Sequence, residues 1–361
     1  MKQKRILHVI NGIGTGGAEK DIVNWYRNID REQYQFDFLI RSNEQFYRDE
    51  IEEMGGNVYV VPEFPRRFIR NIVETMKFMK RHREYVAVHV HGNALIYIIP
   101  LIIASRYKIP IRIMHVHNTK ANGNMSKIVH YVNKLILPKF ATNMVACSKN
   151  AGIFSYGSSS FTIIKNGIDL ERFKINNKSI RPEFNIADDQ IIFTHVGRFL
   201  PVKNHLFLID IFCEIKKIKK NSVLLLVGDG PLNNEVKEYV YKEDLGNSVI
   251  FCGERKDVES ILHDSDMVIF PSIYEGVPLV VLEAQASQTK VLLSDSIDKE
   301  VIITPYAKQL SLKQTAKSWA ECATEFLEKK IECDVDDAFE YAGYSITNSI
   351  EKLYNLYEGL E

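Results

Sequence analysis

Two acidic side chains stand eight positions apart in the stretch of this chain that is best suited to chemistry. Glu275 lies in a Gly-x-Pro turn after the apolar run Met267–Phe270, and Glu283 lies in the apolar run Leu279–Ala286, which has helical character. A strand, a turn and a helix start leave backbone N–H groups free to bind an anion. We therefore expect a bound anion beside Glu275, and the diphosphate of a nucleotide sugar suits such a place.

Two cations could serve the same anion. Arg198 and Lys203 are five residues apart in a loop that follows a predicted strand, and together they could neutralise one diphosphate. Two further strand ends carry glycine or charge, at residues 228–231 and 253–257. Ligands of α/β sheets bind at the carboxyl ends of the strands, so four successive strand ends in this half offer suitable groups.

Clustered glycines follow the first apolar run. Gly12, Gly14 and Gly17 spell G-x-G-x-x-G before an evident helix, which matches the fingerprint of a dinucleotide site. That fingerprint also needs an acid at the end of the second strand, where this chain has Arg41 and Ser42. An arginine could serve a 2′-phosphate, so a nicotinamide enzyme stays open, as does a loop without a ligand.

Two pairs of histidines are spaced to share one face of a strand. His89 and His91, and likewise His115 and His117, stand two apart near strand ends. Zinc ligation is one interpretation, although no Asp, Glu or Cys accompanies either pair at ligand spacing; polar side chains lining a cleft are the other. His117, where the strand gives way to a loop, is the one that we expect to face substrate.

Asp264 and Asp266 form the D-x-D pattern that metal-dependent sugar transferases of another fold use. Here the pattern precedes the strand 267–270, at the sheet edge opposite to the one where ligands bind. We therefore predict a capping or turn role for both residues and no metal site.

Apolar runs alternate with amphipathic stretches twice along the chain, with a polar break at residues 166–190. With 361 residues, 45% hydrophobic and 25% charged, the chain can form two soluble globular domains. The pattern predicts two doubly wound α/β domains with parallel sheets. The predicted strands are residues 5–10, 36–40, 58–61, 86–90, 111–116, 143–146, 161–164, 191–196, 223–227, 249–251, 267–270 and 291–293.

Charge divides unevenly between the two halves. Up to residue 170 there are 24 basic and 14 acidic residues, and after it 22 and 32, so the first half suits anionic partners. Residues 66–83 carry seven Lys/Arg and a helical apolar stripe, which fits either an anionic membrane surface or an ordinary surface helix.

The longest apolar run, residues 94–104, is shorter than the ~20 residues of a spanning helix and predicts a buried helix. Five cysteines without a C-x-x-C pair favour reduced thiols in the cytoplasm.

Taken in order, these motifs resemble the family 4 retaining glycosyltransferases of the GT-B fold, over nearly the whole chain. Within that family the sequence looks closest to bacterial capsule or exopolysaccharide transferases. The matching motifs are Gly-Gly-Ala-Glu at 16–19, His-Asn at 117–118, Asn-Gly-Ile-Asp at 166–169, Gly-Arg with Lys-Asn at 197–204, Gly-Asp-Gly-Pro at 228–231 and Glu-x₇-Glu at 275–283.

The resemblance implies a GT-B enzyme with two Rossmann-like domains facing a cleft. Residues 1–170 would form the acceptor domain, with the C-terminal helix 340–361 packing back on it, and residues 171–339 the donor domain. The enzyme would move a sugar from a nucleotide diphosphate sugar, with UDP as the expected nucleotide, to a glycan or lipid-linked acceptor. It would need neither metal nor cofactor, since Arg, Lys and a helix N-terminus can neutralise the leaving diphosphate.

The same likeness assigns roles to individual residues. Arg198 and Lys203 would hold the donor diphosphate, Glu283 the ribose, and Glu275 the hydroxyls of the transferred sugar, while His117 would contact that sugar near its reacting carbon. The chain departs from the common Glu-Gly-Phe-Gly pattern by having Pro in its turn. Further donor-binding positions would be Gly16, Gly17, Asn166, Gly228, Arg255, Gly276, Val277, Pro278 and Leu279.

Two other functions share this architecture. A nucleotide-sugar epimerase would release free sugar and nucleotide without an acceptor, and a non-catalytic GT-B partner subunit would do no chemistry. For a transferase we expect a cytoplasmic protein, peripheral at the inner face of the plasma membrane if residues 66–83 touch lipid. We expect no nucleic-acid partner.

Overall fold

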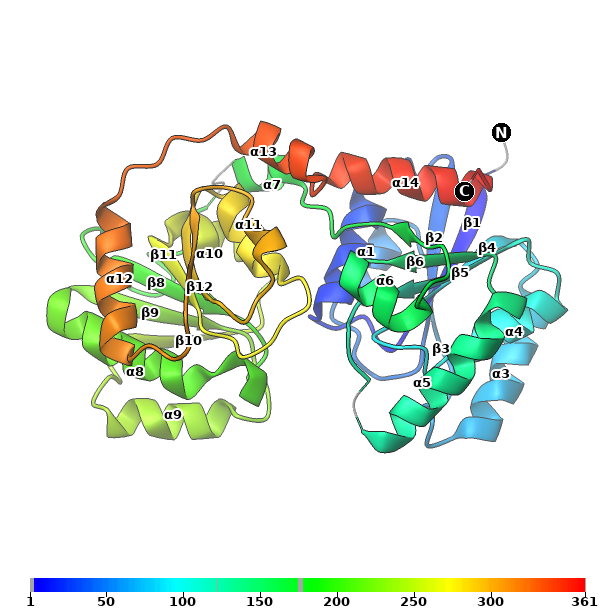
Figure 1. The fold of residues 1–361 in the computed structure, drawn as a ribbon, viewed down its shortest axis with the longest axis horizontal. Helices are drawn as coiled ribbons and strands as arrows, with labels where there is room; N and C mark the ends of the chain where they lie inside the picture. Colours follow the sequence, from blue (N-terminus) through cyan, green and yellow to red (C-terminus); the bar gives the residue numbers. More distant parts are fainter. Residues whose placement is uncertain (1–2, 122, 175–177, 361) are drawn as a thin grey trace. The chain divides into compact units, whose positions relative to one another are not determined.

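The structure is a computed structural model that describes residues 3–121, 123–174 and 178–360 (Figure 1). The chain divides into two compact units, Met1–Gly167 with Gly343–Glu361, and Ile168–Ala342. The chain passes from the first unit to the second after Gly167, within the polar segment predicted as a linker. Residues 175–177 of that segment lie outside the described residues. Within the described ranges no helix is both long enough and apolar enough to cross a bilayer.

The first unit is built on a seven-stranded parallel sheet in the order β3-β2-β1-β4-β5-β6-β7. Its strands are mostly buried, as continuous apolar runs in a doubly covered parallel sheet should be. They are β1 (Lys4–Ile10), β2 (Tyr34–Ile40), β3 (Val58–Val60), β4 (Tyr85–Gly92), β5 (Ile111–Val116), β6 (Asn143–Ala146) and β7 (Thr162–Ile163).

Helices cover both faces of this sheet. One apolar layer includes Trp25 of α1 and Leu353 and Tyr357 of α14, so the end of the chain completes the core of the first unit. The other includes Met79 of α3 and Leu101 of α4. The helices are α1 (Gly17–Asn28), α2 (Arg48–Glu53), α3 (Phe68–Arg81), α4 (Ile99–Arg106), α5 (Asn124–Ile136), the 3₁₀ turn η1 (Leu137–Lys139), α6 (Lys149–Tyr156) and α14 (Ile346–Glu358).

The second unit holds a six-stranded parallel sheet in the order β10-β9-β8-β11-β12-β13. Phe212 of α8 and Trp319 of α12 are fully buried in its main core. The strands are β8 (Ile191–Val196), β9 (Ser222–Val227), β10 (Val249–Gly253), β11 (Met267–Phe270), β12 (Lys290–Ser294) and β13 (Ala307–Leu310). The helices are α7 (Leu170–Lys174), η2 (Pro201–Lys203), α8 (His205–Ile218), α9 (Asn233–Lys242), α10 (Val258–Asp264), α11 (Leu279–Ala286), η3 (Lys299–Val301), α12 (Ala316–Glu328) and α13 (Val335–Ala342).

Both sheets are doubly wound, and each reverses its strand order at one place. The reversal lies between β1 and β4 in the first unit and between β8 and β11 in the second. Open α/β sheets bind ligands outside the carboxyl ends of the strands at such a switch point. The fold therefore directs attention to the loops that follow these four strands.

All twelve predicted strands are present, with ends that shift by at most two residues. The edge strand β13 was not predicted, because its run Ala-Lys-Gln-Leu is too polar to stand out. The prediction of one buried helix over residues 94–104 is wrong at its start. The helix α4 begins only at Ile99, with Pro100 in its first turn, where a missing N–H costs nothing.

Candidate active site

Lys203 and Glu275 form an ion pair at the carboxyl end of the second sheet. Nζ of Lys203 lies 2.7 Å from Oε1 of Glu275, and the two side chains are only 16% and 15% exposed. The loops that carry them are tied together, since Ile273 N donates to the carbonyl oxygen of Val202 at 2.8 Å. The sequence assigned both residues to one ligand, and the structure places them side by side at the β8/β11 switch point.

Glycines allow the loops after β8 and β9 to approach each other closely. Gly228 has φ of +125°, and a Cβ there would collide with the carbonyl oxygen of Gly197. A Cβ on Gly197 would in turn stand 3.1 Å from Cε of Lys203. Gly228, predicted to bind donor, thus shapes the loop beside Lys203, and a side chain at either glycine would disturb that loop.

The helix α11 starts at Leu279, as predicted, with Pro278 as its N-cap at φ −74°. That angle is the one the proline ring enforces, so the unusual Pro278 fits the helix start without strain. Val281 N already donates to the carbonyl oxygen of the N-cap Pro278 at 3.1 Å. The first N–H groups of a helix otherwise lack an acceptor inside it and are suited to an anion. Glu283 is 1% exposed and interacts electrostatically with Arg172 of α7.

The two arginines predicted for the donor differ in their surroundings. Arg198 is exposed in the loop between β8 and Lys203. Arg255 follows β10, two strands from β8, and is held by carboxylates: Nη2 donates to Glu183 at 3.0 Å and Nε to Asp257 at 2.8 Å. These hydrogen bonds raise the pKa of Arg255. Its charge is therefore already balanced inside the protein.

In the first unit, Gly16 and Gly17 are exposed at the start of α1. Gly16 is the N-cap and offers no side chain to the helix, so the backbone N–H groups of this turn can meet an anion. These two predicted positions are exposed to solvent, but the carboxylate of Glu19 lies directly against Gly16, where a Cβ would collide with it.

Gly12 and Gly14 lie against residues 42–44. A Cβ on Gly14 would stand 3.1 Å from a carboxylate oxygen of Glu44, and Ile13 N donates to the carbonyl oxygen of Glu44 at 2.9 Å. The Arg41 guanidinium stacks on Tyr97, 4.3 Å from the ring centre. These contacts occupy the groups that a nicotinamide dinucleotide would use, so the geometry disfavours that alternative.

Asn166 is buried at the joint between the first unit and its last helix. The next residue, Gly167, packs so closely on α14 that a Cβ would collide with Ser349, whose Oγ donates to the carbonyl oxygen of Lys165 at 2.8 Å. Within the described residues Oδ1 of Asn166 has no hydrogen-bond partner. The Asn-Gly turn therefore has a packing role, and the predicted contact of Asn166 with donor stays a prediction.

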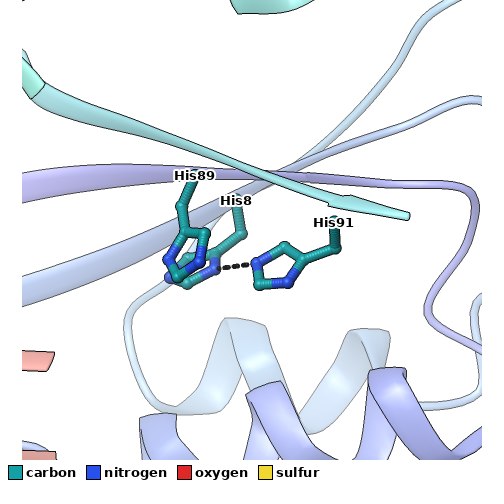
Figure 2. Close-up of side chains that lie close together, drawn as sticks. All are labelled: His8, His89 and His91. Carbon is teal, nitrogen blue, oxygen red and sulfur yellow. Dashed lines mark hydrogen bonds between the residues drawn. The ribbon is translucent and has the colours of Figure 1, made fainter. Parts of the chain in front are cut away.

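Five histidines gather under the carboxyl ends of β1, β4 and β5. Figure 2 shows three of them, His8, His89 and His91, projecting to the same side of two neighbouring strands. Nδ1 of His8 lies 2.9 Å from Nε2 of His91, and Nδ1 of His91 lies 3.0 Å from Nε2 of His117. A second series runs from His115 to His89 at 3.2 Å and on to the Tyr357 hydroxyl at 3.0 Å. We call His8, His89, His91, His115 and His117 the five-histidine cluster.

The series His8, His91, His117 couples the ring hydrogens of its members. Each neutral imidazole carries one N–H, so three rings supply three hydrogens for two N···N contacts. The third hydrogen sits at one end of the series, on Nδ1 of His117 or on Nε2 of His8. Within the described residues both end atoms are buried without a partner, so the tautomer of His117 depends on His8 through His91.

Burial keeps the five-histidine cluster neutral. It lowers the pKa of His8 to about 3 and that of His117 to about 4, and it lowers the pKa of His89, His91 and His115 as well. An isolated charge in such a site is strongly disfavoured. His117 can therefore donate or accept one hydrogen bond at neutral pH but is not an acid there.

Two groups of three histidines within the five-histidine cluster bear on the zinc interpretation. Two groups, His8 with His89 and His91, and His91 with His115 and His117, bring ligand atoms within 4.8 Å of one another. Both consist of histidines alone, and ring nitrogens of neighbouring residues already face each other at hydrogen-bond distance. The hydrogen-bonded series accounts for the arrangement without a metal ion.

Asp264 and Asp266 take the turn role that their position predicted. Asp264 Oδ2 accepts from the backbone N–H of Ile180 at 2.7 Å, and Asp266 Oδ2 accepts from that of Ile192 at 2.7 Å. Both side chains thus tie loops together at the amino edge of the second sheet.

Three contributors to the histidine site were missed from the sequence. His8 belongs to it because β1 pairs with β4 in a register that sets His8 beside His89. Trp25 of α1 stacks on His115, with ring centroids 5.6 Å apart, and Tyr357 comes from the far end of the chain. Only the position of His8 near the end of the first strand could have indicated a role.

Comparison with known proteins adds independent findings. The profile of the family described as "Glycosyltransferase Family 4" matches residues 15–172, and that of "Glycosyl transferases group 1" matches residues 176–345. EpsF of Bacillus subtilis (strain 168), which bears a glycosyltransferase name, is 36% identical over 88% of this chain and 86% of its own length.

A second relative carries a more specific name. The UDP-Gal:alpha-D-GlcNAc-diphosphoundecaprenol alpha-1,3-galactosyltransferase of Escherichia coli is 29% identical over 63% of this chain and 62% of its own. Among solved structures, Anabaena Alr3699/HepE in complex with UDP and glucose superposes with a TM-score of 0.78, at 18% identity, over 98% of this chain and 99% of its own. That likeness establishes a shared fold.

Proposed function

Because this chain belongs to the family 4, group 1 glycosyltransferases, we propose that it transfers a sugar from a UDP-sugar to a glycan or lipid-linked acceptor. The anomeric configuration of the sugar is retained. The observation that carries this proposal is the Lys203–Glu275 pair beside the N-terminus of α11. It combines a cation, backbone N–H donors and a carboxylate at one switch point, and these are the groups that a nucleotide sugar requires.

The donor diphosphate is the leaving group, and its charge grows as the glycosidic bond breaks. Lys203, Arg198 and the first turn of α11 offset that charge, which lowers the barrier because these groups are fixed before the reaction starts. Two cations and a helix N-terminus suffice for a dianion, so the proposed reaction needs no metal. The UDP and glucose in the Anabaena complex support UDP as the nucleotide.

Glu275 and Glu283 recognise the sugars of the donor. Glu275 accepts hydrogen bonds from the hydroxyls of the transferred sugar, and Glu283 from those of the ribose. In the present structure Glu275 pairs with Lys203, so donor binding exchanges part of this ion pair for contacts with phosphate and sugar. The pair holds both side chains in place beforehand, which reduces the ordering cost of binding.

His117 serves the sugar near its reacting carbon as a neutral hydrogen-bonding group. Nδ1 of His117 is buried in the present structure, so donor binding must uncover this atom before its ring hydrogen is donated to a sugar oxygen. His8 and His91 must then carry their ring hydrogens on Nδ1 as well. The departing phosphate oxygen takes the proton of the acceptor hydroxyl on the same face of the sugar. No side chain acts as a covalent nucleophile.

The acceptor and cellular setting complete the proposal. We assign the reaction to cell-surface polysaccharide biosynthesis in the cytoplasm, and the lipid diphosphate acceptor named for the Escherichia coli relative supports a lipid-linked acceptor. The helix predicted to meet membrane is α3. It exposes Phe68, Ile69 and Val73, which supports a contact that stays a prediction.

Ligand-dependent stability tests the donor assignment. A panel of UDP- and GDP-sugars is screened by thermal unfolding, where a donor at a hundred times its Kd adds ~2.7 kcal/mol of apparent stability. The best donor is then incubated with and without acceptor, and the products are separated. Transfer requires the acceptor for rapid turnover, whereas release of free sugar and nucleotide without it would mean an epimerase. Stabilisation by no nucleotide sugar would refute donor binding.

A further inference from the structure

The helix α5 turns its apolar side toward solvent. Five large side chains of this helix are between 53% and 80% exposed. Four of them follow the spacing i, i+3, i+7 and i+10, which places them along one side of a helix. They are Met125, Ile128, Val132 and Leu135, with Tyr131 beside them, and we call these five the α5 stripe.

The inner side of α5 is polar instead. His130 is its only buried residue among those described, and its Nδ1 accepts from Leu95 N at 3.1 Å. Asn133 Nδ2 donates to the carbonyl oxygen of Leu95 at 2.6 Å, and Lys134 Nζ to that of Phe154 at 2.9 Å. A surface helix normally turns its apolar side to the core. In α5 the apolar side faces solvent instead, which indicates that a partner covers the α5 stripe.

The charge around the stripe identifies the kind of partner. Residues 85–168 contain nine Lys or Arg and no Asp or Glu. Lys127 on α5 and Lys139 just beyond it are exposed. An apolar stripe flanked by lysines and free of acids fits an anionic surface. It does not fit a second copy of itself, because a two-fold contact would bring lysines against lysines.

A cavity of about 440 Å³ lies at the start of α5. Its lining includes Thr119 and Lys120 from the loop after β5, and Lys127 and Tyr131 from α5. Tyr131 belongs to the α5 stripe, so the cavity borders the stripe. An acidic headgroup held there would meet two lysines.

We propose that the α5 stripe docks on a bilayer that contains anionic phospholipid. The helix lies along the interface with the stripe among the acyl chains, and the lysines extend their stems to the headgroups. Each lysine near an anionic membrane contributes about fivefold to binding. This surface is separate from residues 66–83, and the proposal does not rest on the proposed reaction.

Vesicle co-sedimentation of the full chain tests it. Vesicles of phosphatidylcholine with phosphatidylglycerol should pellet the wild-type protein, and phosphatidylcholine alone should not. Ile128→Ser with Leu135→Ser should weaken binding about tenfold or more, because two apolar side chains no longer insert. Lys127→Gln with Lys139→Gln should weaken it by about 25-fold and reduce its salt dependence.

Matched controls come from the second unit. Tyr241→Ser removes a side chain of α9 that is 85% exposed, and Lys330→Gln removes an exposed charge; both should bind as the wild type does. Far-UV circular dichroism verifies that every variant is folded. Vesicle binding is measured without nucleotide sugar, so a failed transfer assay does not affect it.

Four results would overturn the proposal. The first is unchanged binding by the Ile128/Leu135 variant, and the second is equal binding of the wild type to neutral vesicles. The third is loss of binding in Ile69→Ser with Val73→Ser while the α5 variants bind normally, which would assign the contact to α3. Ultracentrifugation that finds a dimer dispersed by the Ile128/Leu135 substitutions would also refute it, since a second copy would then cover the stripe.

Discussion

Acid should destabilise the first unit, because the five-histidine cluster cannot take up protons while it is folded. His8 is fully buried on β1, and burial lowers its pKa to about 3. In the unfolded chain a histidine titrates near 6.5. Below that pH the unfolded state therefore binds more protons than the folded state, and stability falls as the pH drops.

The size of the effect follows from these two pKa values. At pH 7 about a quarter of the unfolded histidines carry a proton and the folded His8 does not, so the penalty is only about 0.2 kcal/mol. At pH 5 the unfolded histidine is almost fully protonated and the folded one is not, which favours unfolding by about 2 kcal/mol. The loss continues to grow until the pH reaches about 3.

The variant His8→Leu isolates this contribution. It should lower stability at pH 7, because Nε2 of His91 loses the ring that lies 2.9 Å away. The difference in unfolding free energy between pH 7 and pH 5 should nevertheless shrink by about 2 kcal/mol relative to the wild type. His82→Gln is the matched control, since His82 is a partly exposed histidine of the same unit with a carboxylate partner.

Urea unfolding followed by tryptophan fluorescence measures this difference. The chain has two tryptophans, and Trp319→Phe leaves Trp25, which stacks on His115, as the reporter of the first unit. All variants are compared in this background at both pH values. An equal loss of stability on acidification in the His8→Leu variant and its parent would refute the reasoning. A reduced loss in the His82 control would do the same.

Three further predictions concern the second unit and the reaction. Arg198→Ala and Lys203→Ala should each lower turnover by ~10²-fold or more, as loss of a transition-state charge partner does; wild-type rates in either variant would contradict the donor assignment. Transfer should persist in a chelator, whereas abolition that Mn²⁺ or Mg²⁺ reverses would restore a metal role for Asp264 and Asp266. Gly228→Ala should destabilise the second unit in urea unfolding by about 2 kcal/mol or more, because φ is +125° and Gly197 blocks a Cβ. Gly246→Ala, with open space around it, is its control, and equal stabilities would disprove the steric argument.

Sequence patterns were most informative where one local rule decides the outcome. Parallel strands covered on both faces must be apolar throughout, so the strands were found from their composition. Ligands bind at strand ends in such sheets, so Lys203 and Glu275 could be placed at one site although 72 positions separate them. Pro278 departs from the common pattern of that site, and the structure places it as the N-cap of α11.

Other features depend on which distant segments meet, and local patterns do not contain that information. The histidine pairs were visible in the sequence, but only the register of β1, β4 and β5 joins them to His8 in one hydrogen-bonded series. The glycines at 12 and 14 matched a nucleotide fingerprint, yet residues 42–44 lie where the nucleotide would bind.

By itself, then, the sequence determined the two α/β domains, the strand ends that carry charge, and the residues that resemble a family 4 site. Tertiary structure alone decided the pairing of Lys203 with Glu275, the neutral state of the five-histidine cluster, and the outward direction of the α5 stripe. The reason is physical. Helical periodicity reveals that an apolar side exists, but only the packing of the whole unit decides whether that side meets the core or the solvent.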